Sequence, residues 1–155
     1  MVHEMKRLGM IVDLSHTAAS TMHDVLEGSK AKSWNGSRAP VVFSHSCVYA
    51  LCPHPRNVPD DVLPLVKARN SLVMVTFSSE FVSCRNSEVG NKNGLPERYD
   101  ANLTISQVVR HMRYIGDLIG YEHMGIGSDF DGMPATPQGL EDVTKYPDLV
   151  AEMPR

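Results

Sequence analysis

The eight residues APVVFSHS, at positions 39–46, decide the fold of this chain. Val41 to Ser44 are apolar or small, with β-branched and aromatic side chains that suit a strand buried on both faces. The run follows Pro40 and delivers His45 at its carboxyl end. Barrels and open sheets of parallel strands keep their chemistry at this end of a strand. The stretch therefore predicts a buried parallel strand with a functional histidine at its end.

The same arrangement occurs twice more along the chain. Residues 10–14 (MIVDL) form a short apolar run that ends in Ser15 and His16, and residues 123–128 (HMGIGS) deliver Asp129. The carboxyl ends of parallel strands meet at one edge of a sheet. The three strand ends therefore predict one active-site face.

Strands alternate with helices over the whole length. We expect strands at 10–14, 40–45, 71–77 and 123–128, and helices at 3–9, 18–28, 60–69, 104–118 and from 147 onward. This alternation indicates parallel strands with helices outside them. A nucleotide-binding open sheet would carry a Gly-rich turn after its first strand, and residues 13–17 (DLSHT) are not such a turn. The pattern therefore favours four βα units, half of a (β/α)8 barrel, within one domain.

Three segments between these elements carry further expectations. Pro64 lies past the first turn of a helix counted from Pro59, so it should kink that helix unless its regular part starts later. Residues 78–101 read as a long loop, and a loop of that length is functional or disordered. Trp34, in the polar segment 29–38, is expected to pack as an anchor over a surface cleft.

Composition excludes several classes of function. The net charge of −3 gives no reason to expect nucleic acid or an anionic membrane as a partner. Residues 1–155 contain no run of 18 apolar residues and do not open with a signal sequence, so membrane attachment is not encoded in them. Cysteines at 47, 52 and 84 allow either three buried thiols or one disulfide with one free thiol.

Localisation stays undecided at this stage. The triplets Asn35-Gly36-Ser37 and Asn102-Leu103-Thr104 match the acceptor pattern for N-glycosylation. Together with a disulfide they would fit a secreted or cell-surface protein, but such triplets are common by chance. A cytoplasmic location therefore remains open.

The strand-end side chains suit metal-assisted catalysis. His16 and His45 can bind zinc through a neutral ring nitrogen, although a catalytic zinc takes three protein ligands. Asp129 suits a proton shuttle or an outer metal ligand, against the simpler alternative of a turn aspartate. Arg56 can clamp a carboxylate with two parallel hydrogen bonds, against the alternative of a solvated surface charge. His111 is expected to be a structural hydrogen-bonding group, and the remaining histidines, His3, His23, His54 and His123, surface or packing residues.

Six ordered motifs make the chain resemble the membrane dipeptidase (renal dipeptidase) family of zinc peptidases, with fungal members the most similar. The motifs are DLSH (13–16), APVVFSHS (39–46), RNVPDDVL (56–63), SLVMV (71–75), GIGSDFDG (125–132) and GLEDVTKYPDL (139–149). The resemblance implies the C-terminal half of a metal-dependent hydrolase barrel over residues 1–155. It also implies hydrolysis of dipeptides at a centre of two Zn²⁺ ions.

The resemblance also implies roles for individual residues. His16 and His45 match two histidine ligands of one zinc, and Asp129 matches the aspartate that handles protons at the scissile amide. Arg56 matches the arginine that holds the terminal carboxylate of the dipeptide. Among the cysteines, Cys52 and Cys84 match a family disulfide, which leaves Cys47 as a free thiol.

The departures from the family pattern keep an alternative open. Three kinds of family residue belong before Met1: the His-x-Asp ligands, the bridging glutamate and a further substrate histidine. Phe81 stands where animal members have a tyrosine. Pro154 interrupts the last helix. The alternative is a non-catalytic binding or oligomerisation module that keeps the barrel fold without a complete metal site. A weaker third is a hydrolase of another amide. Open sheet edges would also allow a homodimer.

Overall fold

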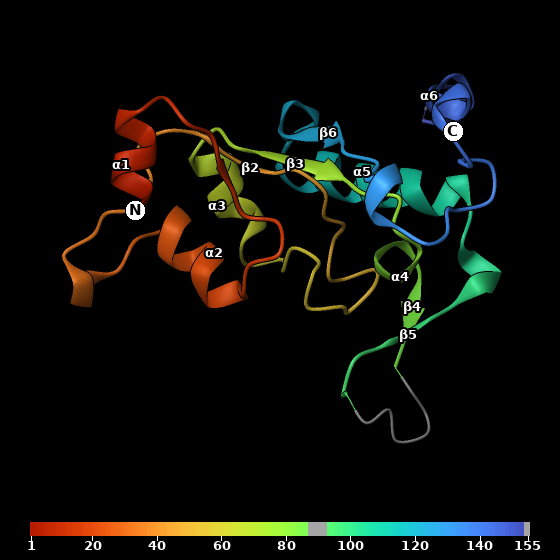
Figure 1. Ribbon diagram of the computed structural model, residues 1–155, viewed down its shortest axis with the longest axis horizontal. Helices are drawn as coiled ribbons and strands as arrows, with labels where there is room; N and C mark the ends of the chain where they lie inside the picture. Colours follow the sequence, from red (N-terminus) through yellow and green to blue (C-terminus); the bar gives the residue numbers. More distant parts are fainter. Residues whose placement is uncertain (87–92, 154–155) are drawn as a thin grey trace.

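A four-stranded parallel sheet forms the centre of the structure (Figure 1). The computed structural model describes residues 1–86 and 93–153, so the expected helix break at Pro154 lies outside the described residues. The strands are β1 (Val12–Asp13), β2 (Val41–Phe43), β3 (Leu72–Val75) and β6 (Met124–Ile126). They lie in the order β1-β2-β3-β6, and every neighbouring pair is parallel.

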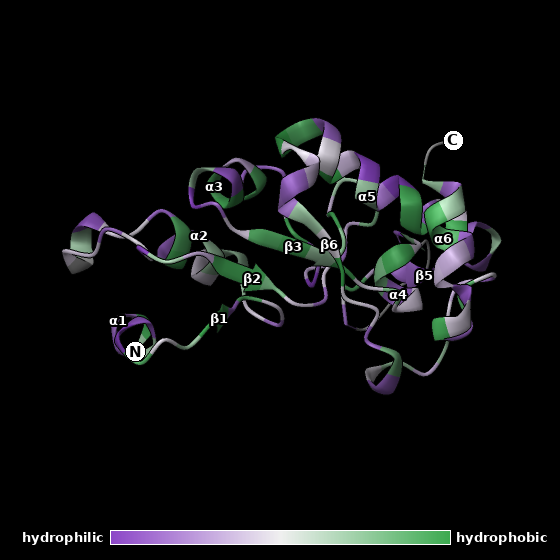
Figure 2. Cartoon of the chain, turned by 90° about the horizontal axis from the view of Figure 1, so that it is seen from above, coloured by the Kyte–Doolittle hydropathy of each residue, from purple (hydrophilic) through white to green (hydrophobic). Residues whose placement is uncertain are grey.

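The order of the strands identifies the type of winding. Each strand pairs with the one before it along the chain, without the reversal that marks a doubly wound sheet. A sheet that winds in one direction keeps its helices on one side, as a barrel does. Helices α3 and α5 lie on one side of the sheet in Figure 2, and α2 packs beside α3. The predicted α/β fold of βα units from a barrel is therefore confirmed.

Five of the six α-helices within residues 1–86 and 93–153 lie at the predicted positions, with bounds that differ by a few residues, and α4 lies in the segment predicted as a loop. The six are α1 (Val2–Arg7), α2 (Ala19–Leu26), α3 (Leu63–Ala68), α4 (Ser79–Val82), α5 (Ile105–Ile119) and α6 (Tyr146–Glu152). Thr104 caps α5, where its side-chain oxygen accepts a hydrogen bond from the N–H of Gln107. None of the helices in the described part of the chain is long and apolar enough to span a membrane.

The two faces of the sheet differ in burial, which corrects the expectation for β2. Val41 and Phe43 are fully buried under the helices, whereas Val42 on the opposite face is half-buried. Leu72 and Met74 of β3 share that half-buried face. The run of apolar residues does suit burial on both sides, but four strands cannot curl far enough to cover their own inner face. The expectation of burial on both faces was therefore wrong for this chain.

Pro64 does not kink a helix, because α3 begins only at Leu63. Pro64 thus occupies the first turn, where a missing N–H removes no intrahelical hydrogen bond. The residues between Pro59 and Leu63 form a turn instead, in which the Val62 N–H donates to the carbonyl of Pro59 at 3.0 Å. The regular part of the helix therefore starts later than Pro59, which is the condition under which the sequence predicts no kink.

The segment 78–101, expected to be one long loop, contains regular structure in its described part. It holds helix α4 and an antiparallel pair formed by β4 (Cys84–Arg85) and β5 (Glu97–Arg98). A disulfide joins Cys84 to Cys52, and Cys47 is a buried free thiol. Elements of two to four residues are too short to show a hydrophobic period, so the sequence pattern could not reveal them.

His111 ties three segments together in the core. Its Nδ1 accepts a hydrogen bond from the Val48 N–H at 3.2 Å, and its Nε2 donates to the Val82 carbonyl at 2.9 Å. The side chain is fully buried, and burial lowers its pKa to about 4. The expected structural role of His111 agrees with these contacts, which hold the segment after β2 against α4 and α5.

The buried His111 should make stability depend on pH. The unfolded chain takes a proton on this residue near pH 6.5, while the folded chain resists until about pH 4. The stabilisation is therefore complete above about pH 6.5, and about 3 kcal/mol of it is lost as the pH falls to about 4. Urea unfolding across this range measures the loss. His111→Gln should remove most of the slope, and an unchanged slope in that variant would contradict the assignment.

Candidate active site

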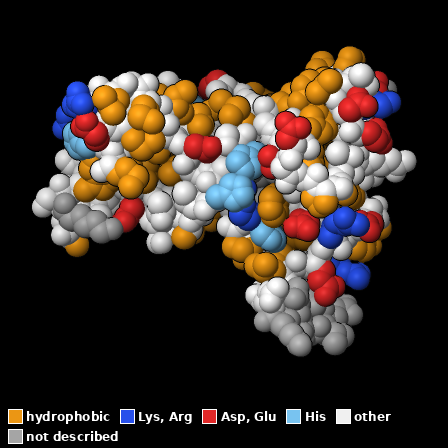
Figure 3. Space-filling view, in the orientation of Figure 1, with side chains coloured by type: hydrophobic (Ala, Val, Ile, Leu, Met, Phe, Trp, Pro, Cys, Tyr) orange, Lys and Arg blue, Asp and Glu red, His pale blue; other side chains and the backbone are white. Residues whose placement is uncertain are grey.

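The carboxyl ends of the strands bring the predicted metal and acid–base residues to one edge of the sheet. His16 follows β1, His45 follows β2 and Asp129 follows β6. The rings of His16 and His45 lie side by side, with centroids 4.8 Å apart and a tilt of 54° between their planes. Histidine side chains gather in the middle of the face that Figure 3 shows, with a cationic side chain beside them.

Two of these residues have an unusual backbone conformation. His16 has a φ of +63° and Asp129 a φ of +64°, both in the left-handed region. A residue with a Cβ loses roughly 1–2 kcal/mol in this region, and such strain concentrates at functional sites. Neither the His16 ring nor the Asp129 carboxylate makes a hydrogen bond within residues 1–86 and 93–153. Both strand ends therefore hold polar side chains that are free to meet a ligand.

Arg56 is the most unusual group at this edge. Its Nε, Nη1 and Nη2 atoms are buried, and none has a hydrogen-bond partner in the described part of the chain. The guanidinium carbon lies 5.0 Å from the centroid of the Phe81 ring, and the His54 ring packs 4.7 Å from the same centroid. Burial lowers the pKa of Arg56, and the charges of Asp129 and Asp13 act in the opposite direction and raise it. The guanidinium nitrogens of Arg56 are thus buried beside the site, which does not fit the solvated surface charge of the alternative.

Asn57, which the sequence analysis did not single out, fixes the loop that carries Arg56. Its side chain is fully buried and accepts a hydrogen bond from the Cys47 N–H at 3.1 Å. The Asn57 amide also donates to the carbonyls of Cys52 at 3.0 Å and Phe81 at 2.9 Å. With the Cys52 disulfide, these contacts bind the loop after β2 to α4. An asparagine between two prolines was the only sequence signal for this role.

The charged side chains at this edge act on the His16 ring. Burial lowers the pKa of His16, and the nearby Arg56 and His45 lower it further. Asp129 and Asp13 act in the opposite direction on the same ring. A neutral imidazole is the form that binds a metal. The arrangement therefore brings two imidazoles together near a carboxylate and a buried cation, and the lowered pKa of His16 favours the neutral form of its ring.

Asp13 and Ser44 form a second layer behind His45 that the sequence pattern did not single out. The Ser44 hydroxyl donates to Asp13 Oδ2 and lies 2.6 Å from His45 Nδ1. Desolvation acts to raise the pKa of Asp13, but the hydrogen bonds from Ser44 and Ser15 hold it below its usual value. The signal in the sequence was faint: Asp13 is a charged residue within an apolar strand, and it points to the half-buried face of the sheet.

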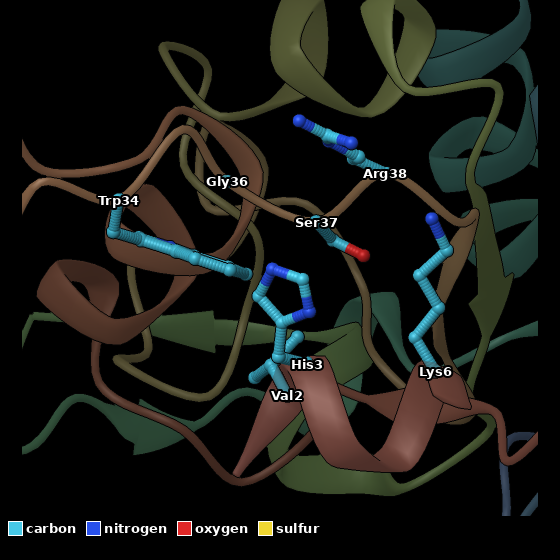
Figure 4. A pocket seen from close by; sticks show the side chains of 7 residues that line it. All are labelled: Val2, His3, Lys6, Trp34, Gly36, Ser37 and Arg38. Carbon is cyan, nitrogen blue, oxygen red and sulfur yellow. The ribbon is translucent and has the colours of Figure 1, made fainter. Parts of the chain in front are cut away.

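A small cavity lies away from this edge. It is lined by Val2, His3, Lys6, Trp34, Gly36, Ser37 and Arg38 (Figure 4). The Trp34 Nε1–H donates to the Asp24 carbonyl at 2.6 Å, so Trp34 is the expected packed anchor beside a surface cavity. The loop that carries it precedes β2, at the amino-terminal edge of the sheet. The cavity therefore stands apart from the candidate active site.

Fold and site together define a class of protein: a barrel-type parallel sheet with paired imidazoles and a buried arginine at its carboxyl edge. The sequence model of the membrane dipeptidase family (peptidase family M19) matches residues 1–155. The chain belongs to this family.

Similar proteins agree with this assignment. The chain is 46% identical over 153 residues to dipeptidase aclJ of Aspergillus oryzae and 47% identical to dipeptidase tcpJ of Claviceps purpurea. Each match covers 99% of this chain but 31% of the relative. The chain therefore spans about a third of the length of these curated relatives.

Solved structures show the same fold. One is the dipeptidase AC, a metallopeptidase of family M19, with 33% identity and a TM-score of 0.78. Another is a metallopeptidase from Rhodobacter sphaeroides bound to a phosphinate mimic of the dipeptide L-Ala-D-Ala, with 33% identity and a TM-score of 0.76. Each structural match covers 99% of this chain and 38% of the solved chain.

The left-handed conformation of His16 leads to a stability prediction. Glycine adopts this conformation without a steric penalty, so His16→Gly should leave the free energy of unfolding unchanged or raise it by about 1 kcal/mol. His111→Gly is the matched control and should destabilise the protein by about 3 kcal/mol or more, since two buried backbone groups lose their partners. Urea unfolding of both variants measures the difference. Equal destabilisation by the two substitutions would show that His16 is an ordinary structural histidine.

Proposed function

We propose that residues 1–155 supply part of the active site of a zinc-dependent dipeptidase, in which a metal-activated water hydrolyses the peptide bond of a dipeptide. The proposal concerns a longer protein that contains this chain, because the relatives named dipeptidases are about three times as long. The single observation that carries it is the buried and unpartnered guanidinium of Arg56 at the strand ends.

A buried charge without a partner is costly unless a ligand completes it. The guanidinium of Arg56 offers planar donors that match the two oxygens of a carboxylate. The Phe81 ring supports one face of the group, and Asn57 holds its loop in place. A dipeptide carries a free carboxylate one residue from its scissile bond, which suits an arginine placed beside the catalytic groups. A longer peptide would place a neutral amide against the same cation.

His16 and His45 fit one zinc ion, since their rings lie side by side, and desolvation and the nearby Arg56 lower the pKa of His16, which favours its neutral form. Zinc, when bound, would supply a hydroxide at neutral pH and polarise the scissile carbonyl. The described residues contain no group of three or more His, Cys, Asp and Glu side chains that could hold a metal. In this proposal, the further ligands and the second zinc of the pair come from outside the described residues.

Asp129 is the proposed acid–base residue. Its carboxylate has no hydrogen bond within the described parts of the chain, so an oxygen is available to accept and return a proton. The left-handed backbone at Asp129 orients the side chain at the end of β6, and its charge reaches both His16 and Arg56. In this role Asp129 would take the proton from the attacking water and deliver it to the leaving amine.

The absence of a third ligand in the described residues also supports a second candidate: a non-catalytic binding module of the same fold. Such a module could use Arg56 to hold a carboxylate without any hydrolysis. Metal content and turnover separate the two functions. We expect a longer protein that includes this chain to hold close to two zinc ions and cleave a simple dipeptide, and the 155-residue chain alone to cleave none. Carboxylate binding by the longer protein without zinc or turnover would favour the binding module.

Arg56→Met should lower kcat/KM for a dipeptide by about 100-fold, because the substrate carboxylate loses a paired cation. The same variant should not lose thermal stability, since it removes a buried charge without a hydrogen-bond partner. Steady-state kinetics on the longer protein and a thermal melt measure the two effects.

The matched control is a change in the substrate. The amidated dipeptide lacks the carboxylate, so Arg56→Met and the parent enzyme should cleave it with similar kcat/KM. An equal loss on the free acid and on the amide would show that Arg56 does not recognise the carboxylate. Arg56→Lys should recover only part of the activity, because an ammonium group cannot form the two parallel hydrogen bonds.

A further inference from the structure

The structure shows a hydrogen-bonded chain that runs from Asp13 through Ser44 to His45. Asp13 Oδ1 accepts from the backbone N–H groups of Ser15 at 2.9 Å and Ser44 at 3.1 Å. Asp13 Oδ2 accepts from the Ser44 hydroxyl, and the Ser44 Oγ lies 2.6 Å from His45 Nδ1. Asp13 ends β1 and Ser44 follows β2 directly, so the chain crosses from one strand end to the next.

We propose that Asp13 and Ser44 are positioning residues that fix the tautomer of His45, with the proton on Nδ1 and the lone pair of Nε2 free for a ligand. Counting protons leads to this assignment. A carboxylate only accepts, and a serine hydroxyl has one proton to give. Since Ser44 gives that proton to Asp13, its oxygen can only accept from the His45 ring, and Nδ1 must therefore carry a hydrogen.

The backbone supports the same orientation of the His45 ring. The His45 N–H donates to Ser15 Oγ at 3.0 Å, and this hydroxyl lies 3.2 Å from the Ser46 hydroxyl. Ser15 and Ser46 are both buried. These contacts fix the backbone on both sides of the ring, while among the described residues only Ser44 hydrogen-bonds to a ring nitrogen of His45. Tautomer control and backbone position are thus assigned to different serines, which can be substituted one at a time.

The Nε2 atom of His45, left without a proton, can bind a metal ion. A metal-binding histidine commonly donates its other ring N–H to a fixed acceptor, which sets the tautomer and the orientation of the ring. That Nε2 serves a zinc ion rests on the proposed function, whereas the tautomer follows from the hydrogen bonds alone. His16 makes no hydrogen bond within the described residues, so the constraint acts on one of the two imidazoles.

Asp13→Asn gives the sharpest test, because it reverses the direction of the chain. The asparagine side-chain carbonyl can still accept hydrogen bonds from the backbone N–H groups of Ser15 and Ser44. Its NH₂ group then donates to Ser44 Oγ. The Ser44 hydroxyl would in turn donate to His45 Nδ1, and the ring proton would move to Nε2. The expected result is an Nδ1–H ring in the parent chain and an Nε2–H ring in Asp13→Asn, at a pH where the ring is neutral.

The ¹⁵N chemical shifts of the two ring nitrogens, measured in the 155-residue chain, distinguish the tautomers. Ser44→Ala should leave a mixture of the two forms, and Ser44→Thr should keep the Nδ1–H form because it keeps the hydroxyl. Ser46→Ala is the matched control: it removes a buried serine hydroxyl at the same strand end and should leave the tautomer unchanged. An Nε2–H ring in the parent chain, or an unchanged tautomer in Asp13→Asn, would overturn the proposal.

A titration with Zn²⁺ on the same ring signals, in a longer protein that contains this chain, separates this proposal from the proposed function. Half-saturation in Asp13→Asn should require about 10–100-fold more Zn²⁺ than in the parent chain. Equal half-saturation in the two chains would overturn the positioning role. If the tautomers are as expected but no ring signal responds to Zn²⁺, the zinc assignment fails and the tautomer assignment stands.

Discussion

The parallel pairing of β1 with β2, of β2 with β3 and of β3 with β6 is the constraint on which the site depends. Val12 pairs with Val41, Val42 with Leu72, and Val75 with Ile126, so neighbouring strands end at nearly the same level. Residues that follow these strands are separated by up to 113 positions in the sequence, from His16 to Asp129, yet their charges act on one another. The Asp13 carboxylate then joins the first two strand ends through hydrogen bonds to Ser44.

Polar side chains in this fold fall into two groups, those with hydrogen-bond partners in the described part of the chain and those without. In the supporting layer they are satisfied, as for His111, Asn57 and Asp13, each of which makes two or more hydrogen bonds. At the strand ends Arg56 is buried without a hydrogen-bond partner among the described residues. Burial of an unsatisfied group costs free energy that packing elsewhere must offset. The contrast indicates a surface arranged for a ligand, supported by a rigid layer behind it.

The fold was predictable because its signals are local and repeated. Apolar runs located the strands and the longer helices, and the side-chain cap of Thr104 on α5 agrees with the predicted start of that helix. The residues of the candidate site also had a positional signal, since each directly follows an apolar run or lies on the next loop. The exposure of Val42 could not be foreseen, because burial of an inner face depends on neighbours that the local pattern does not contain. The Asp13–Ser44–His45 chain depends on side-chain directions across two strands, and sequence spacing says nothing about them.

The claim that His16 and His45 bind one metal ion is the centre of the proposed function, and X-ray absorption at the zinc edge tests it most directly. The sample is a longer protein that contains this chain, loaded with Zn²⁺, with a variant in which both histidines are replaced by alanine as the comparison. We expect scattering from histidine rings at about 2.0–2.1 Å in the parent protein, reduced by two rings at one zinc in the variant. Identical histidine scattering in the two samples would contradict the claim, because the zinc would then be bound by other residues.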